Sequence, residues 1–278
     1  MERRFSVSRS GSRNKINQAN DEREKTTMNT TLTAIIVTTC LLGAVLFGLH
    51  LRRFISAQYL SADVKDSVKL AMGLVATMAA LLLGLLVSSA KGSYDTVRSQ
   101  VIEMATKITL LDRMLVVYGP EAAEARVRFR AVMEEEVQRM WPADASTPIQ
   151  LSPNPQAGNA FYVAIQSLSP QDETQRSLKI QAASFAVELA QLRALQLAQS
   201  APSISKPLLI VVVFWLVVIF LSFSLLAPPN AIATLSMLVS SLSVSGAIFL
   251  ILELDRPFGG VMRISSEPML HTLSQLAK

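Results

Sequence analysis

Side chains that could do metal or acid–base chemistry are few in this sequence and lie far apart. The chain has two histidines, His50 and His271, and one cysteine, Cys40. Zinc and haem sites usually need several such ligands close together, so no metal site and no cofactor is predicted. The acidic run Glu134–Glu136 is most simply a solvated helix face. No phosphate loop, zinc-protease motif or nucleophile elbow is present, and we find no basis for an enzyme.

Weakly polar side chains instead recur at helical spacing inside two uncharged runs. Steps of three and four residues place them on one stripe in each run. The first stripe is Gly73, Thr77, Ala80, Gly84 and Ser88, and the second is Ser236, Ser240, Ser243 and Ala247. Small residues let two helices approach closely, whereas hydroxyl groups along a water-filled path can solvate an ion. Helix packing and pore lining are therefore both open readings of these residues.

The runs that carry the stripes are long enough to cross a membrane. The turn Pro228–Asn230 separates two uncharged runs, Pro207–Ala227 and Ala231–Leu252, and further uncharged runs predict spans at 30–51 and 70–90. At 1.5 Å per residue, each can cross a hydrocarbon core of roughly 30 Å. The sequence therefore predicts an all-α integral membrane protein with four transmembrane helices, of which the last two form a hairpin.

Positive charge near the span ends predicts how the chain crosses the bilayer. Eleven lysines and arginines lie near the span ends on the side that holds the C-terminus, against four on the other side. The positive-inside rule then places both termini and residues 91–206 in the cytoplasm. Residues 1–29 are predicted to be a basic disordered tail, and Met28 offers a second start of translation. No basic stripe with aromatic residues is present, so the lipid bilayer is a predicted partner and nucleic acid is not.

Residues 91–206 are predicted to be a helical insertion between the second and third spans. Apolar residues at steps of four and three continue from the second span, which predicts one long helix that ends at Gly119-Pro120. They are Val97, Val101, Met104, Ile108, Leu111, Leu115 and Tyr118. A last helix from Pro170 carries a matching coiled-coil seam at Leu178, Ala182, Phe185, Leu189 and Leu192. Two such seams predict an antiparallel stalk, packed within one subunit more readily than between subunits of an oligomer.

The segment between these two long helices is predicted to hold a shorter helix and a loop. The helix Glu121–Trp141 has an apolar face, and its Arg130 and Glu134 are spaced to pair. Four prolines from Pro142 to Pro155 predict a loop after it.

The fourth span runs directly into an exit motif within residues 253–278. The motif contains Glu253, Asp255, Arg256, Pro257, Phe258, Gly259 and Gly260. Arg256 can pair with Glu253 or Asp255, and Ser265 or Ser266 can cap a short amphipathic helix. The apolar residues of that helix are Met269, Leu270, Leu273 and Leu276. The motif is either a membrane-exit turn anchored among headgroups, or a gate or subunit contact.

The exit motif resembles the closing motif of a known family. Glu-Leu-Asp-Arg-Pro-Phe-Gly-Gly at 253–260, followed by Arg-Ile-Ser-Ser-Glu-Pro at 263–268, is similar to the end of the last span in bestrophin-like bacterial membrane proteins. The leucine-rich run at 81–86 is a second match, and the likeness covers about residues 30–270. The acidic pair expected after the second span is missing from Val97–Thr109, and no aromatic residue lies in that span.

The resemblance implies a function that composition does not show. It implies a homo-oligomer in a bacterial inner membrane, with a pore for small anions such as chloride lined by the second span. A hypothesis of another class is a non-conducting membrane scaffold or sensor whose cytoplasmic helical stalk binds a partner protein.

Overall fold

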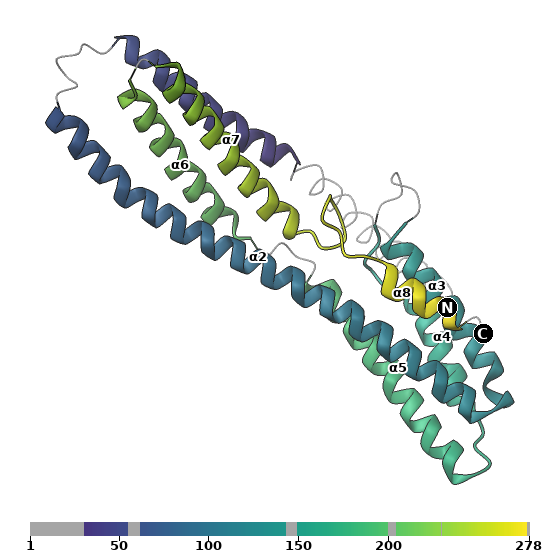
Figure 1. Cartoon of the computed structure of the whole chain (residues 1–278). Helices are drawn as coiled ribbons and strands as arrows, with labels where there is room; N and C mark the ends of the chain where they lie inside the picture. Colours follow the sequence, from purple (N-terminus) through teal and green to yellow (C-terminus); the bar gives the residue numbers. More distant parts are fainter. Residues whose placement is uncertain (1–30, 55–61, 143–148, 200–203, 229, 277–278) are drawn as a thin grey trace, which may run out of the picture. The chain divides into compact units, whose positions relative to one another are not determined.

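The computed structural model describes residues 31–54, 62–142, 149–199, 204–228 and 230–276, and contains helices and loops over them (Figure 1). Four of these helices are long and apolar enough to cross a membrane: Thr31–Phe54, Asp63–Tyr118, Lys206–Leu226 and Ala231–Leu254. A helical segment separates the second from the third, so the predicted all-α membrane fold is confirmed. The basic tail at 1–29 lies outside the described residues.

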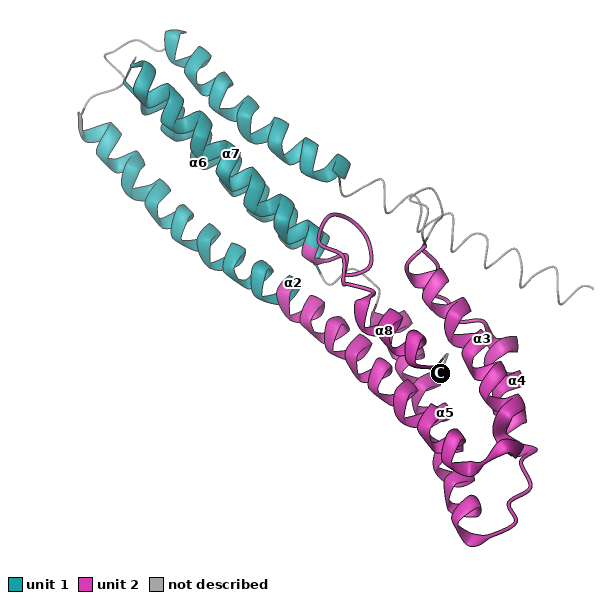
Figure 2. Ribbon diagram, turned by 45° about the vertical axis from the view of Figure 1, so that its right-hand side comes forward, with its two compact units in different colours: residues 1–90, 204–253 teal, residues 91–203, 254–278 magenta. Residues whose placement is uncertain are grey.

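The chain forms two compact units, each built from two stretches of sequence (Figure 2). Unit 1 comprises residues 1–90 and 204–253, and unit 2 comprises residues 91–203 and 254–278. Besides the first span helix, the helices are α2 (Ala62–Tyr118), α3 (Ala123–Met140), α4 (Pro155–Gln166), α5 (Glu173–Gln199), α6 (Lys206–Leu226), α7 (Ala231–Leu254) and α8 (Glu267–Leu276). Helix α2 has 57 residues and contributes to both units, which confirms that the second span continues as one long helix.

Small residues bring the helices of unit 1 together. Gly48 of the first span helix lies so close to α6 that an added Cβ would be 2.7 Å from the Cβ of Ser224 and 2.9 Å from the carbonyl oxygen of Leu221. Ser224 is fully buried, and its hydroxyl donates a hydrogen bond to the Phe220 carbonyl at 2.7 Å. Because that hydroxyl bonds within its own helix, a polar side chain can be buried here without an unpaired donor.

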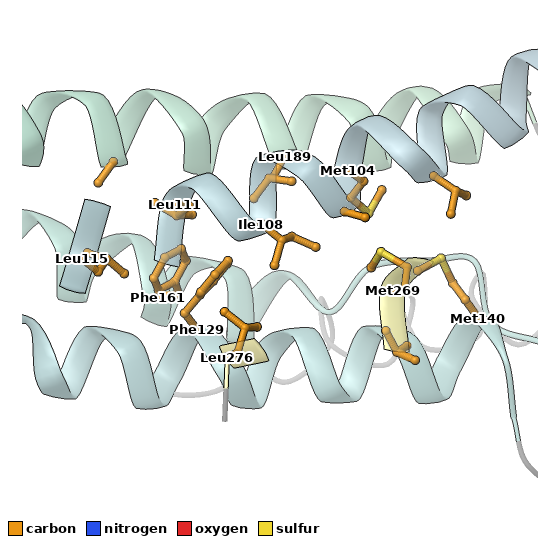
Figure 3. Packing of buried hydrophobic residues seen from close by; sticks show 14 of the residues in the cluster. Met104, Ile108, Leu111, Leu115, Phe129, Met140, Phe161, Leu189, Met269 and Leu276 are labelled. Atoms are coloured by element: carbon orange, nitrogen blue, oxygen red, sulfur yellow. The ribbon is translucent and has the colours of Figure 1, made fainter. Parts of the chain in front are cut away.

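The two predicted seams lie in the core of unit 2, together with residues of α3, α4 and α8 (Figure 3). All seven seam residues of α2, from Val97 to Tyr118, are buried. On α5, Ala182 and Leu189 are buried and the other seam residues are half-buried against the same cluster. Both seams therefore pack within one chain, which is the alternative favoured above over an oligomer interface.

Helix α4 was not anticipated, and the loop prediction is wrong where this helix begins. Pro155 is in its first turn, where a missing N–H leaves no hydrogen bond unmade. The side-chain oxygen of Asn154 accepts from the backbone N–H groups of Gln156 at 3.1 Å and Ala157 at 3.4 Å. The helix places Phe161 in the core, stacked on Phe129 with ring centroids 4.7 Å apart. The last proline thus starts a helix instead of extending a loop.

Helix α2 ends at Tyr118, directly before Gly119-Pro120, as predicted, and a side chain of α5 hydrogen-bonds to its last residue. Gly119 has φ 120°, a conformation that favours glycine, and Pro120 opens the short 3-10 turn η3 (Pro120–Ala122) that leads into α3. The Gln175 side chain of α5 donates to the Tyr118 carbonyl at 3.0 Å. The Asp172 carboxylate accepts from the backbone N–H of Gln175 at 2.7 Å, which caps α5.

Gly48→Ala should destabilise unit 1, because its Cβ would meet backbone and buried side-chain atoms of α6. The expected loss is about 1–3 kcal/mol, typical of an overpacked contact, and is measured as a lower Tm of the purified protein. Gly43→Ala on the same helix is the control, since a Cβ there meets no described atom within 4 Å. Equal Tm values for the two variants would contradict the close approach.

Candidate functional site

The small-residue stripe of α2 is uncovered. Gly73, Thr77, Ala80, Gly84 and Ser88 are all exposed. An added Cβ at Gly73 or Gly84 would meet no atom of the described residues within 4 Å. The Thr77 hydroxyl donates to the Leu74 carbonyl at 2.7 Å, so its oxygen keeps free lone pairs on the exposed surface. No helix among the described residues of this chain therefore packs on the stripe at its two glycines.

The serine stripe of α7 is also exposed, and a second set of serines does the packing. Ser236, Ser240 and Ser243 are exposed. Ser241 and Ser245 are buried and donate to the carbonyls of Leu238 and Ser241, both at 2.9 Å. Ser241 and Ser245 were not predicted to be buried. Every face of α7 carries apolar and small residues, so the spacing of residues does not distinguish its buried face.

The exit motif from Pro257 onward forms a closed loop on the core of unit 2. Phe258 is buried and meets Trp141 of α3 edge to face, with ring centroids 5.7 Å apart. The Trp141 indole N–H donates to the Ile264 carbonyl at 2.9 Å, and the Ile264 N–H donates to the Pro257 carbonyl at 2.7 Å. Gly260, with φ 76°, makes the turn between them.

The residues of the exit motif that precede this loop are buried or half-buried. Glu253 is buried at the end of α7, while Asp255, Arg256 and Gly259 are half-buried. In the short helix that follows, the Ser265 hydroxyl accepts from the Glu267 N–H at 3.1 Å, as predicted for a cap. Met269 and Leu276 of this helix are buried and Leu273 is half-buried, whereas Leu270 is exposed.

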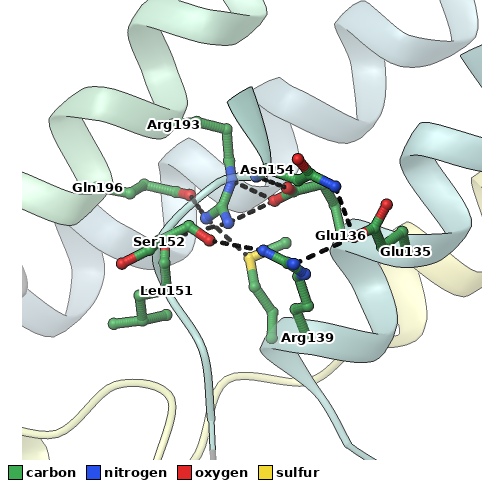
Figure 4. A network of polar contacts seen from close by, with 9 residues as sticks. Glu135, Glu136, Arg139, Leu151, Ser152, Asn154, Arg193 and Gln196 are labelled. Carbon is green, nitrogen blue, oxygen red and sulfur yellow. Dashed lines mark hydrogen bonds and ion pairs between the residues drawn. The ribbon is translucent and has the colours of Figure 1, made fainter. Parts of the chain in front are cut away.

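A buried ion pair joins α3 to α5 (Figure 4). The guanidinium of Arg193 donates to one carboxylate oxygen of Glu136 from Nε at 2.9 Å and from Nη2 at 2.5 Å. The other carboxylate oxygen accepts from the backbone N–H of Asn154 at 3.1 Å. Arg193 also donates to the Gln196 side chain and to the Leu151 carbonyl, each at 3.2 Å. Glu136 therefore does not belong to a solvated face, and that prediction is wrong for this residue.

Sequence spacing did contain a signal for this pair. On α3, Phe129, Met133, Glu136 and Met140 follow steps of four and three, and on α5 the seam continues from Leu189 to Arg193 and Gln196. Charged residues that continue an apolar seam predict burial, and one of each sign predicts a pair.

Two further ion pairs join α2 to the same two helices. Arg126 of α3 makes a bidentate contact with Asp112 at 2.8 and 3.1 Å, and this hydrogen bonding raises the pKa of Arg126. Lys107 donates to Glu188 of α5. That hydrogen bond raises the pKa of Lys107 and lowers the pKa of Glu188. Helices α2, α3 and α5 are thus linked in all three pairings by opposite charges.

The Tyr118 side chain at the end of α2 is also buried. Its hydroxyl is buried and has no hydrogen-bond partner among the residues that the structure describes, and burial raises the pKa of this phenol. Among the described residues, no group of three His, Cys, Asp or Glu side chains could hold a metal ion.

These features define a multi-pass helical membrane protein with a second, helical unit that is built from the segment between the second and third spans and the segment after the fourth. The Bestrophin-like domain matches residues 20–269, and the chain therefore belongs to the bestrophin-like family. A crystal structure of a bacterial bestrophin homolog from Klebsiella pneumoniae, with one tyrosine mutated to alanine, is similar with a TM-score of 0.63. The alignment covers 88% of this chain and 97% of that chain at 12% identity, which shows a shared fold. No curated protein sequence matches the chain.

Arg193→Ala should destabilise unit 2 strongly, because it leaves the Glu136 carboxylate buried without its counter-charge. The expected loss is about 3–5 kcal/mol, read as a lower Tm. Arg130→Ala is the control: its pair with Glu134 lies 2.7 Å apart at the surface, and losing it should cost under about 1 kcal/mol. The double variant Glu136→Leu/Arg193→Met should regain part of the loss. If Arg193→Ala is no worse than Arg130→Ala, the pair is not an essential contact.

The pair Lys107–Glu188 should make stability depend on pH at the acid end. The pKa of Glu188 is lowered from its ordinary value of 4.5, so the pair stabilises the fold above that value and loses its effect as pH falls through the folded pKa. The Tm difference between wild type and Glu188→Gln should therefore be constant near neutral pH and vanish in acid. In a Lys107→Met background, Glu188→Gln should produce no such pH-dependent difference. A difference that persists in acid would refute the assignment.

Proposed function

We propose that this protein is the subunit of an oligomeric, anion-permeable channel in which the membrane part of α2 lines the pore. The observation that supports this is the uncovered stripe from Gly73 to Ser88. In α2, 11% of the apolar stretch that could cross a membrane is buried, against 33%, 22% and 28% of the corresponding stretches of the other three span helices. Of the two span helices that carry a weakly polar stripe, α2 is thus the one that the described part of this chain covers less.

The chemistry of the stripe suits a path for small ions. Exposed hydroxyl groups at Thr77 and Ser88 can replace part of an ion's hydration shell, and no charged residue stands between Lys69 and Lys91 to trap an ion. Exposed leucines flank the stripe, and in an oligomer these would meet neighbouring subunits or lipid. They are Leu70, Leu74, Leu81 and Leu85. The choice of anions such as chloride rests on the resemblance to bestrophin channels, since the span itself carries neither acidic nor basic side chains.

Conduction is tested by reconstituting the purified protein in planar bilayers with a salt gradient across them. A reversal potential near the chloride equilibrium value is expected. An assembled oligomer that carries no current would contradict the channel and favour the scaffold or sensor function. Exposed apolar side chains on unit 2 would then be the first candidates for the partner-binding surface: Val117, Val127 and Ile180 are 68%, 70% and 65% exposed.

Gly84→Leu should lower the conductance severalfold, because it adds a large apolar side chain to the proposed pore wall. Leu82→Ile is the matched control, since it conserves volume two residues away, off the stripe. Single-channel recording of both variants at equal protein density gives the comparison. Wild-type conductance in both would mean that the stripe faces lipid.

The proposed topology has both termini and unit 2 in the cytoplasm of a bacterial cell, with the turn at Asn230 outside. In a Cys40→Ser background, Asn230→Cys should react with a membrane-impermeant maleimide in intact cells, and a reporter fused after Lys278 should be cytoplasmic. Reaction only after permeabilisation would reverse the orientation.

A further inference from the structure

Unit 2 contains a cavity of about 510 Å³ that none of the preceding assignments uses. Its floor is buried and largely apolar, from Met104 on α2, Phe129 on α3, Leu189 on α5 and Met269 on α8. Its rim is exposed and comes from α4 and α5, including Gly158 and Ala190. The cavity thus opens between these two helices over a floor to which four helices contribute.

A space of this size over a largely apolar floor suits an apolar occupant better than water. Ordered water needs two to four polar partners, and the floor of Met104, Phe129, Leu189 and Met269 offers no strong hydrogen-bonding group. The volume falls within the range of small-molecule sites. Methionines at 104, 133 and 269 give the walls adaptable, polarisable side chains, which suit apolar ligands of variable shape.

The charges at the cavity indicate which ligands fit. The charged residues that line it are Glu136 and Arg193, and each neutralises the other within the buried network of Figure 4. Among the described lining residues a charged ligand would find no unpaired counter-charge, so its burial would be unfavourable. At the rim, the exposed Asn159 and Gln191 can hydrogen-bond a hydroxyl or carbonyl group.

The geometry points to a binding site in this cavity for a neutral molecule with an aliphatic body and one polar end. The same chemistry is found in a free long-chain alcohol and in the acyl chain of a membrane lipid. This binding site does not depend on the proposed channel function. A protein that binds the ligand but carries no current would contradict only the channel. A protein that conducts but does not bind the ligand would contradict only the binding site.

The test is photolabelling of the full-length protein in liposomes with a diazirine-bearing octanol, and in parallel with phosphatidylcholine that carries the diazirine on an acyl chain. Labelled peptides are mapped by mass spectrometry. We expect label on the α4 and α5 residues that line the cavity. Label from the alcohol alone identifies a free molecule as the ligand, and label from the phospholipid identifies a lipid chain.

Two variants fill the cavity from opposite walls. Gly158→Phe starts from a position where a Cβ meets nothing within 4 Å, and Ala190→Phe projects from α5. Each should lower the cavity label by about tenfold, as for the loss of most ligand contacts. The control, Ala160→Phe, places the same side chain on an exposed position of α4 that does not line the cavity.

Three results would overturn the proposal. Label confined to the span helices would place both probes in lipid alone. Equal cavity label in all variants would mean that the reagent does not enter the cavity. Loss of the oligomer in both filled variants, seen by size-exclusion chromatography, would mean that another copy of the chain occupies the cavity.

Discussion

The arrangement of unit 2 depends on one buried ion pair, Glu136–Arg193. Removing two charges from water costs several kcal/mol for each ion, so the pair is tolerated only when the remaining donors and acceptors are satisfied. Neighbouring groups meet this requirement: Gln196 and Leu151 accept from Arg193, and the Asn154 backbone donates to Glu136. The pair therefore fixes α3, α5 and the segment between α3 and α4 at the same point.

The start of α4 follows from the same contact. Asn154 gives its backbone N–H to Glu136 and uses its side chain to cap α4, so the carboxylate helps to set where this helix begins. Helix α4 then supplies Phe161 to the core and Gly158 to the cavity rim. Unit 1 follows a different rule: at Gly48 and Ser224 its helices approach through small residues, and its buried hydroxyls bond within their own helices.

Local periodicity predicted the fold well and the polar contacts poorly. The four spans, the continuous α2 and both seams follow from uncharged length and from steps of four and three, which depend on neighbouring residues alone. Glu136 and Arg193 are 57 residues apart, and spacing within one helix does not say which distant helix it meets. Helix α4 was missed because Pro155 was read as a loop residue, whereas Asn154 before it makes that proline a helix start. The exposure of the α2 stripe likewise depends on where other helices lie, which the stripe itself does not encode.

Unit 2 is assembled from two separated stretches, and this has a consequence for its biosynthesis. Phe258, Ile264, Met269 and Leu276 belong to its core, yet the ribosome makes them after α6 and α7. Because chains fold as they emerge from the ribosome, residues 91–203 must wait with part of their apolar core uncovered while two more spans are synthesised. Unit 2 can therefore be complete only after the third and fourth spans have been synthesised. A chain cut short after α7 would keep that apolar surface open, a feature by which chaperones and proteases can recognise an unfinished subunit.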